Sequence, residues 1–440
     1  MLDEIQNFLS LDYWRSFLKS PTKKKLTENF LSLSLLQGLN YILPLITLPY
    51  VVRVLGVEKF GLIAFAQAFL GYFVIVVAYG FNLSATREIS INRENKEKVS
   101  EIFSSVIFAK IILACLSFLV LLSLLFLVPK FRTFWLLYLL MFEIVIWDII
   151  FPVWFFQGVE KMKFITMIAF LSKLITVVFI FVLIKKPSDY ILYPVVDFIG
   201  NIIAGAWAIK IILKNFKVKL KVPGLENIKY QFKEGWHIFI SNLAISLYTT
   251  SNTFILGIFT NNIIVGYYAG AEKILKAALG VFSPLSQAVY PHINKLLSAS
   301  KEKAIKFIRK LFILMSGGTF VLSLIIFIFS GTIINIILGN NYQNSIGVLR
   351  ILAFLPFIVG LSNVFGIQTM IPFNFKKAFS RILIFAGLLN VFLLLVLIPF
   401  LKEKGVAVSW LATEIFVTTS MFFYLEKKGI KIFSAKINDK

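Results

Sequence analysis

The chain has 440 residues, of which 58% are hydrophobic and only 15% are charged. Soluble proteins carry about a quarter charged residues, and the apolar runs of about 20 residues that recur here are typical of membrane-spanning helices. The composition therefore excludes an ordinary soluble domain. The net charge of +23 indicates either a nucleic-acid partner or a membrane protein with basic loops.

The N-terminal segment differs from the rest of the chain. Acidic residues come early and no basic stretch precedes a continuous apolar core, so we expect no cleaved signal peptide. Apolar residues recur at helical spacing over residues 1–20, before Pro21 and the basic run 23–25. This pattern predicts a short interfacial helix within a cytoplasmic segment 1–28, with a frayed tail as the alternative.

Twelve membrane-spanning helices are expected after this segment. Each is an apolar run bounded by charged or turn-forming residues. The expected spans are 29–52, 60–84, 102–128, 134–156, 164–184, 190–213, 235–258, 264–290, 306–330, 346–371, 378–400 and 405–424. The longest internal connections, 85–101, 214–234 and 291–304, are too short to fold as a soluble catalytic domain.

The Lys and Arg residues are distributed unequally between the two sides. Alternate connections, counted from the N-terminal segment, hold 31 of the 45 basic residues, the opposite set holds 8 and the spans hold 6. Because basic loops stay in the cytoplasm, we expect both termini to be cytoplasmic. Topology and attraction to anionic membrane lipids then explain the positive charge, and no nucleic-acid partner is expected.

A short internal repeat suggests that the twelve spans are a duplicated six. The stretch GLIAFAQ at Gly61–Gln67 matches GYYAGAE at Gly266–Glu272 in one Gly and two Ala, with an offset of 205 residues. Six spans are an even number, so the two copies would be parallel repeats packed around a central cavity. The resulting fold is an all-α integral membrane protein of two six-helix lobes. Its predicted parts are an N-terminal lobe 29–213, a cytoplasmic linker 214–234, a C-terminal lobe 235–424 and a cytoplasmic basic tail 425–440.

Ionisable side chains inside the predicted spans are the candidate functional residues. Each costs about 2.5–3.5 kcal/mol near the bilayer centre, so it normally faces a partner or a wet cavity. The basic candidates for substrate binding in the cavity are Arg53, Lys110, Lys173, Lys273 and Lys276. The acidic candidates for ion coupling are Glu143, Asp148, Asp197, Glu272 and Glu414.

The stretch VGYYAGAEKILKAA at Val265–Ala278 holds three of these charges. Glu272 and Lys276 stand four residues apart with Glu first, which favours an intrahelical ion pair. Lys273 has no partner in its own helix. A lysine pair that opens on a wet cavity suits a phosphate-bearing substrate, because ammonium is a compact phosphate partner. A purely structural network of charges is the alternative.

The sequence gives little support for a disulfide, a metal site or an enzymatic activity. The single Cys115 excludes an internal disulfide, and the two histidines, His237 and His292, are far apart in the predicted topology. We find no phosphate-binding glycine loop and no nucleophile motif. We therefore expect no enzyme, no cofactor and no metal site.

Four segments carry a resemblance to a known family: Leu35–Phe69, Gly80–Ser90, Gln157–Thr166 and Val265–Ile274. They resemble the polysaccharide transporter family, the bacterial flippases of undecaprenyl-diphosphate-linked O-antigen or capsule repeat units. This family belongs to the multidrug/oligosaccharidyl-lipid/polysaccharide exporter superfamily. The resemblance covers essentially the whole chain.

The resemblance implies a function and a set of partners. A lipid-linked oligosaccharide would be moved from the cytoplasmic to the outer face of the bacterial inner membrane by alternating access. Basic cavity residues would hold the diphosphate, and a proton or sodium gradient would energise the cycle. A polysaccharide polymerase and a chain-length regulator are possible partners, and one chain with two lobes is sufficient as a monomer.

Three alternatives stay open at this point. A multidrug or cation exporter of the same superfamily would share the fold, and a lipid II flippase would share the lipid carrier. A membrane glycosyltransferase or polymerase would need an acidic catalytic group on a large external loop. The predicted connections contain no such loop.

Overall fold

The structure is a computed structural model that describes residues 21–430 and Ile432. The predicted interfacial helix within residues 1–20 and most of the basic tail lie outside these residues. All regular secondary structure in the described residues is helical. Eight segments of them are long and apolar enough to cross a membrane. An all-helical, multi-pass membrane protein is thus confirmed.

The first half of the chain forms two long helices, α3 and α5, and several shorter ones. The elements are α3 (Pro21–Ala78), α4 (Phe81–Asn92), α5 (Lys96–Leu127), α6 (Pro129–Arg132), α7 (Trp135–Met141), α8 (Glu143–Ile150), α9 (Val153–Gly158), α10 (Met162–Leu183), η1 (Pro187–Ile191) and α11 (Leu192–Asn215). The predicted spans of this half all fall on these helices. The helix α3 covers the first of them and most of the second, whose end falls on α4. It breaks at Gly56, whose φ of 74° is in the left-handed region that glycine tolerates best.

The helices of the second half are more often interrupted than the sequence suggested. They are α12 (Leu225–Thr249), α13 (Ser251–Phe259), α14 (Asn262–Gly280), α15 (Ser283–Ala299), α16 (Lys301–Ile328), α17 (Ser330–Ile337), η2 (Asn340–Tyr342), α18 (Asn344–Leu352), α19 (Leu355–Phe365), η3 (Gly366–Met370) and α20 (Lys376–Lys427). The predicted spans 235–258 and 264–290 are each divided between two helices. The long α20 covers two predicted spans and breaks at Lys402, which has a φ of 49°.

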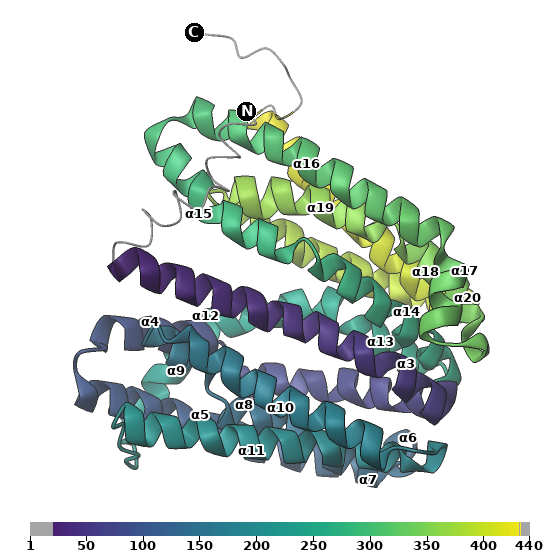
Figure 1. The fold of residues 1–440 in the computed structure, drawn as a ribbon, viewed down its shortest axis with the longest axis horizontal. Coiled ribbons are helices and arrows are strands. Elements are labelled where there is room, and N and C mark those ends of the chain that lie inside the picture. The colour runs from purple at the N-terminus through teal and green to yellow at the C-terminus, as the bar shows by residue number, and fades with distance from the viewer. Residues whose placement is uncertain (1–20, 431, 433–440) are drawn as a thin grey trace.

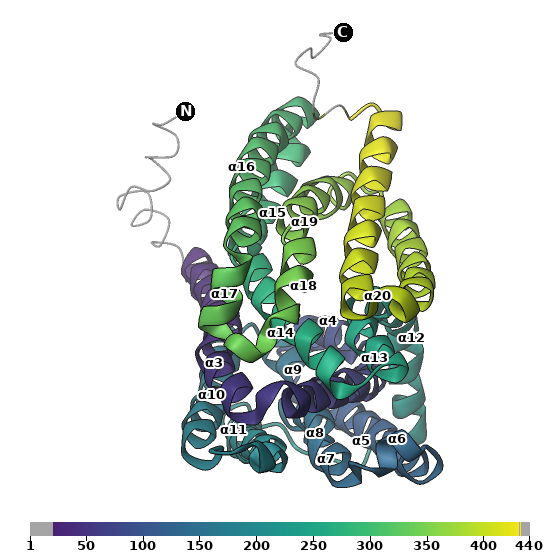
Figure 2. The same cartoon turned by 90° about the vertical axis from the view of Figure 1, so that its right-hand side faces the viewer.

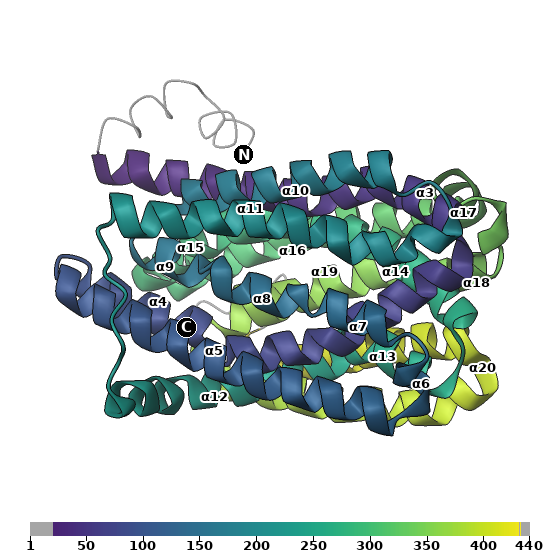
Figure 3. The same cartoon turned by 90° about the horizontal axis from the view of Figure 1, so that it is seen from below.

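The helices form two groups with a layer between them (Figure 1, Figure 2). On one side lie α5, α8, α10 and α11, on the other α15, α16, α19 and α20, and between the groups lie α3, α13 and α14. The long helices run roughly along the longest axis of the molecule (Figure 3). The short helices α6 and α17 both lie at the same end of this axis, away from the described start of α3, on different sides of the molecule. We call this end the distal end.

The crossing of α3 and α14 joins the two halves of the chain. A Cβ atom added to Gly61 would overlap the carbonyl oxygen of Asn262, and one added to Gly266 would overlap that of Val57. Only hydrogen fits at either position, so the two backbones lie in direct contact. Gly61 and Gly266 are the matched glycines of the predicted repeat, and the structure brings them together.

An aromatic stack extends this junction toward the distal end. The ring of Phe65 in α3 is stacked on Phe131 of α6, with centroids 6.0 Å apart, and on Phe254 of α13, at 5.8 Å. Phe65 also fills the space over Gly257, where any side chain would collide with its ring. These contacts bury apolar surface from both halves of the chain in one core.

Candidate functional site

Four of the ten predicted charged positions lie close together, and we call them the central cluster: Glu143, Lys173, Asp197 and Lys273. The carboxylate of Asp197 interacts electrostatically with both Lys173 and Lys273, and Glu143 interacts with Asp197. Three members come from α8, α10 and α11 of the first half, and Lys273 comes from α14 of the second. The central cluster therefore lies where the two halves of the chain meet.

Uncharged polar groups hold the two carboxylates of the central cluster. The Asn201 side chain donates from Nδ2 to Glu143 Oε2 at 2.8 Å, and Ser172 donates to Asn201 Oδ1 at 2.7 Å. Thr176 is hydrogen-bonded to Asp197. With two acids and two lysines, the cluster has the composition to exchange a cation and to meet an anionic group.

The lysine that lacked a partner in its own helix has contacts in the other half of the chain. Lys273 Nζ lies 5.1 Å from the ring centroid of Phe60 in α3, within range of a cation–π interaction. Its electrostatic partner Asp197 lies on α11. Neither contact is local in sequence, so neither could be inferred from spacing along α14.

The predicted intrahelical pair is present on α14. Lys276 Nζ lies 3.0 Å from Glu272 Oε1, and Thr253 of α13 donates to the other carboxylate oxygen at 3.2 Å. The Glu272 side chain is buried, whereas that of Lys276 is 50% exposed. Lys276 thus keeps donor capacity toward a ligand while Glu272 is fixed between two helices.

A second ion pair joins two residues that the sequence suggested for separate roles. Lys110 Nζ lies 2.7 Å from Asp148 Oδ2 and also donates to the Asp148 carbonyl oxygen at 3.0 Å. The Lys110 side chain is completely buried. A buried charge of this kind is tolerated because its partner is hydrogen-bonded to it. The pair therefore ties α5 to α8.

The remaining two predicted positions are not members of the central cluster in the described part of the chain. Arg53 is exposed and donates from Nη2 to the carbonyl oxygen of Ile336 in α17, at the distal end. Glu414 is hydrogen-bonded to Trp410, one turn earlier in α20. Arg53 joins the two halves of the chain, whereas the contact of Glu414 stays within its own helix.

Sequence reasoning missed a basic residue at the distal end. Lys130 in α6 donates to the carbonyl oxygens of Gly257, Ile258 and Thr260, at the C-terminal end of α13. The last carbonyls of a helix have no partner within the helix and carry partial negative charge, so they attract cations. Lys130 lies in a short connection between spans, where the sequence gives no signal beyond its charge. We call the contacts of Arg53 and Lys130 with the second half the distal contacts.

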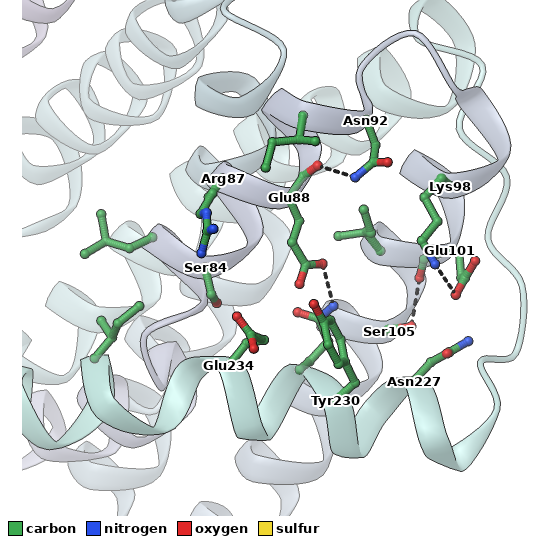
Figure 4. Close-up of a pocket in the computed structure, with 15 residues that line it drawn as sticks. Ser84, Arg87, Glu88, Asn92, Lys98, Glu101, Ser105, Asn227, Tyr230 and Glu234 are labelled. Atoms are coloured by element: carbon green, nitrogen blue, oxygen red, sulfur yellow. Dashed lines mark hydrogen bonds and ion pairs between the residues drawn. The ribbon is translucent and has the colours of Figure 1, made fainter.

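A polar cavity of about 820 Å³ lies between α4, α5 and α12. Glu88 and Glu234 extend into the space between α4 and α12 (Figure 4). Gln231 donates from Nε2 to Glu88 Oε2 at 2.9 Å, and the charge of Glu88 raises the pKa of Tyr230. Polar side chains of this cavity thus connect the first half of the chain to α12, the first helix of the second half. Its residues lie close to the basic connections, where the sequence pattern predicts a solvated surface.

The described residues contain no cluster of side chains suited to bind a metal ion. Within residues 21–430 the side chains of His, Cys, Asp and Glu form no group of three or more that could hold a metal ion. The carboxylates and ammonium groups of the central cluster can take part in ion pairing, hydrogen bonding and cation exchange.

Comparison with known proteins identifies relatives over nearly the full chain. Residues 26–297 match the family model described as "Polysaccharide biosynthesis protein". A protein of Escherichia coli (strain K12) named "Putative O-antigen transporter" is 37% identical over 412 residues, 93% of this chain and 99% of the relative. A protein of the same name from Shigella dysenteriae is 30% identical over 405 residues, 90% of this chain and 98% of the relative.

Solved structures of transporters share the fold. An inward-facing multidrug resistance MATE family transporter of the MOP superfamily superposes with a TM-score of 0.70 at 14% identity, covering 89% of this chain and 96% of the other. The lipid II flippase MurJ in an inward closed conformation also gives 0.70, at 16% identity, covering 89% of this chain and 87% of the other. The family match and the two relatives show that this chain, a multi-pass membrane transporter and not an enzyme, belongs to the polysaccharide biosynthesis protein family.

Proposed function

We propose that the protein is a flippase that moves an undecaprenyl-diphosphate-linked oligosaccharide, an O-antigen or capsule repeat unit, from the cytoplasmic to the outer face of the bacterial inner membrane. The observation that carries this proposal is the central cluster, in which Asp197 of the first half interacts with Lys173 of its own half and with Lys273 of the second. Charges shared by two halves of a membrane transporter favour a substrate path between them. The names of the two curated relatives support a glycan substrate.

The lysines of the central cluster and its neighbour Lys276 are the proposed contacts of the diphosphate. Ammonium groups bind phosphate as compact charges, and Lys276 is half exposed. Lys110 is a secondary candidate because its side chain is completely buried against Asp148. Arg53 is secondary because it lies at the distal end, on the Ile336 carbonyl.

The acids of the central cluster are the proposed sites of ion coupling. Glu143 and Asp197 lie beside the cluster lysines, so binding of a proton or a sodium ion there would change the net charge that the substrate meets. Asp148, Glu272 and Glu414 are the further candidates. This arrangement links cation binding to substrate release without any direct contact between the two ligands.

The proposed architecture is two six-helix lobes, residues 29–213 and 235–424, joined by the linker 214–234. The contact of the matched glycines Gly61 and Gly266 supports an axis of pseudo-symmetry between the lobes. Both termini would be cytoplasmic, which makes the distal end the outer one. The distal contacts of Arg53 and Lys130 would then hold the outer end closed in an inward-facing state.

Two other transport functions share part of this support. A multidrug exporter is favoured by the balance of acids and lysines in the central cluster and by the fold shared with a MATE transporter. A lipid II flippase is favoured by the fold shared with MurJ. Transport of a cationic dye without any effect of lipid-linked glycans would select the first. Transport restricted to lipid II would select the second.

The direct test is flipping in proteoliposomes. Liposomes would carry the protein and an undecaprenyl-diphosphate-linked oligosaccharide, and protection of the glycan from an external sugar-modifying enzyme would be followed with and without a proton or sodium gradient. We expect gradient-dependent flipping that falls at least about tenfold in a Lys273→Ala/Lys276→Ala variant, because the diphosphate loses its charge partners. Lys210→Ala, which removes an exposed lysine of α11, is the matched control and should flip normally.

The outcomes separate the parts of the proposal. Normal flipping by the Lys273→Ala/Lys276→Ala variant would assign those charges a structural role and would leave the flippase function intact. Absence of flipping by the native chain, with the dye-transport assay positive, would refute the glycan substrate.

A further inference from the structure

A second cavity, which we call the C-terminal cavity, lies between α15, α16 and α19. Its volume is about 450 Å³. Its polar lining consists of hydroxyl and amide side chains without a formal charge: Ser283, Ser286, Gln287, Tyr290, Thr319 and Asn363. A charged ligand bound here would lack an opposite charge in the lining, which is costly in a membrane protein. The lining therefore favours a ligand that is polar and neutral.

The C-terminal cavity lies where several helices are interrupted. One helix ends at Gly280 and the next begins at Ser283, while α18 ends at Leu352 and α19 begins at Leu355. The segment Gly366–Met370 that follows α19 is a π-helix. Broken helices and π-turns free backbone groups and recur at the binding sites of transporters and other proteins. Three such interruptions around one cavity indicate a binding site.

A hydrogen-bond network fixes part of the lining. Gln368, in the π-helix, is completely buried and donates from Nε2 to the carbonyl oxygen of Ser286 at 2.9 Å and to its hydroxyl at 2.8 Å. Ser286 Oγ in turn donates to Asn363 Oδ1 at 3.0 Å. The Asn363 side chain is thereby oriented and supplies two further donors from Nδ2. Gln368 itself does not line the cavity, and its role is to hold Ser286 in place.

The C-terminal cavity adjoins the proposed diphosphate contacts along one helix. Leu279 in the last turn of α14 belongs to its lining, and Lys276 lies one turn earlier, about 4.5 Å along the helix axis. The lining also includes two aromatic rings, those of Phe282 and Tyr290. Cationic and neutral polar surfaces thus follow each other, which matches a diphosphate followed by a sugar.

We propose that the C-terminal cavity binds an uncharged sugar ring of the transported glycan while the diphosphate contacts Lys273 and Lys276; this rests on the proposed flippase function. Sugar hydroxyls both donate and accept, so they can use the Asn363 and Gln287 amides and the Ser286 and Thr319 hydroxyls. The CH faces of the ring pack on the aromatic side chains. A site built to hydrogen-bond hydroxyl groups discriminates strongly against a ligand that lacks them.

The test compares the binding of two lipids to the full-length protein in detergent by native mass spectrometry. The probes are undecaprenyl diphosphate and undecaprenyl-diphosphate-linked N-acetylglucosamine. We expect the native chain to bind the sugar-bearing lipid at least about tenfold more tightly. Asn363→Leu and Gln287→Leu should each remove most of this preference, since each deletes hydrogen bonds to the sugar, and leave binding of undecaprenyl diphosphate unchanged.

Controls and outcomes separate this subsite from the proposed function. Asn335→Leu, at an exposed position of α17, should keep the full preference, and thermal unfolding would verify that all variants fold. Retained preference in both Asn363→Leu and Gln287→Leu, or equal binding of the two lipids by the native chain, would overturn the subsite and leave the flippase function standing. Failure of the native chain to bind either lipid would refute both.

Discussion

Replacing Lys130 by Met should open the distal end of the protein. Lys130 donates to three carbonyl oxygens at the C-terminal end of α13, and these contacts join α6 of the first half to the second half. A cation at a helix C-terminus contributes about 0.3–1 kcal/mol when exposed and up to about 2 kcal/mol in partly buried geometry. Burial lowers the pKa of Lys130, which means that desolvation offsets part of the attraction. We therefore expect a loss of about 1 kcal/mol, or roughly a fivefold shift toward states with an open distal end.

Cysteine accessibility measures this shift. Ala64 in α3 is buried one turn from Gly61, at the crossing of α3 and α14. The native Cys115 would be replaced by Ala so that an Ala64→Cys variant has a single thiol. The rate of labelling by a membrane-impermeant maleimide in proteoliposomes should rise about fivefold when Lys130→Met is added. Labelling would be limited to the outer side by quenching reagent on the inner one.

A matched lysine at the same end provides the control. Lys59 Nζ lies 5.3 Å from the ring centroid of Phe134 and 5.0 Å from that of Tyr190, both in the first half. Lys59→Met removes a cation of the distal end without any contact between the halves, so labelling of the Ala64→Cys thiol should not change. Equal labelling rates in the Lys130→Met and Lys59→Met variants would refute the argument that the carbonyl contacts keep the distal end closed.

Two further predictions concern the contacts that hold the helices together. Lys110→Met should lower the free energy of unfolding by about 3–5 kcal/mol, because it leaves the Asp148 carboxylate without its cation, and adding Asp148→Leu should restore much of this loss. Thermal unfolding in detergent would measure both variants. Equal stability of the single and the double variant would contradict the pairing. Gly266→Val should prevent folding, because the added Cβ would overlap the backbone of α3. Gly317→Ala is the control, because the space around its added atom is open. Size-exclusion chromatography should give normal yields of monodisperse protein for Gly317→Ala and none for Gly266→Val. Normal yields of the Gly266→Val protein would contradict the close crossing.

The overall fold follows largely from apolar patterning, but its interruptions do not. Runs of apolar residues indicate where a helix can cross a membrane, and the helices of the structure cover those runs. Breaks within a run depend on local backbone choices that composition hardly affects, such as the left-handed conformation of Gly56. The predicted span 264–290 illustrates this limit: no charged residue separates Gly280 from Ser283, yet the helix ends at the first and restarts at the second.

The candidate site was predictable to the extent that its contacts are local. Glu272 and Lys276 are one helical turn apart, so their spacing alone predicts the ion pair that the structure contains. Lys110 and Asp148 are 38 residues apart, and no pattern in one sequence indicates which of several buried acids a given lysine meets. Lys130 was missed because its partners are backbone carbonyls, which every residue has.

The distal contacts give the proposed duplication support that is independent of the two matching heptapeptides. With the offset of 205 residues between Gly61 and Gly266, Arg53 corresponds to Ile258, and Ile336 corresponds to Phe131. The first distal contact joins Arg53 to the Ile336 carbonyl, and the second joins the Ile258 carbonyl to Lys130, the neighbour of Phe131. The two distal contacts therefore lie at equivalent places of the repeat, and in each a basic side chain donates to helix carbonyl oxygens. Both basic side chains come from the first half of the chain. If the duplication is correct, the repeat determines where the halves touch, and the sequence of each half decides which side supplies the charge.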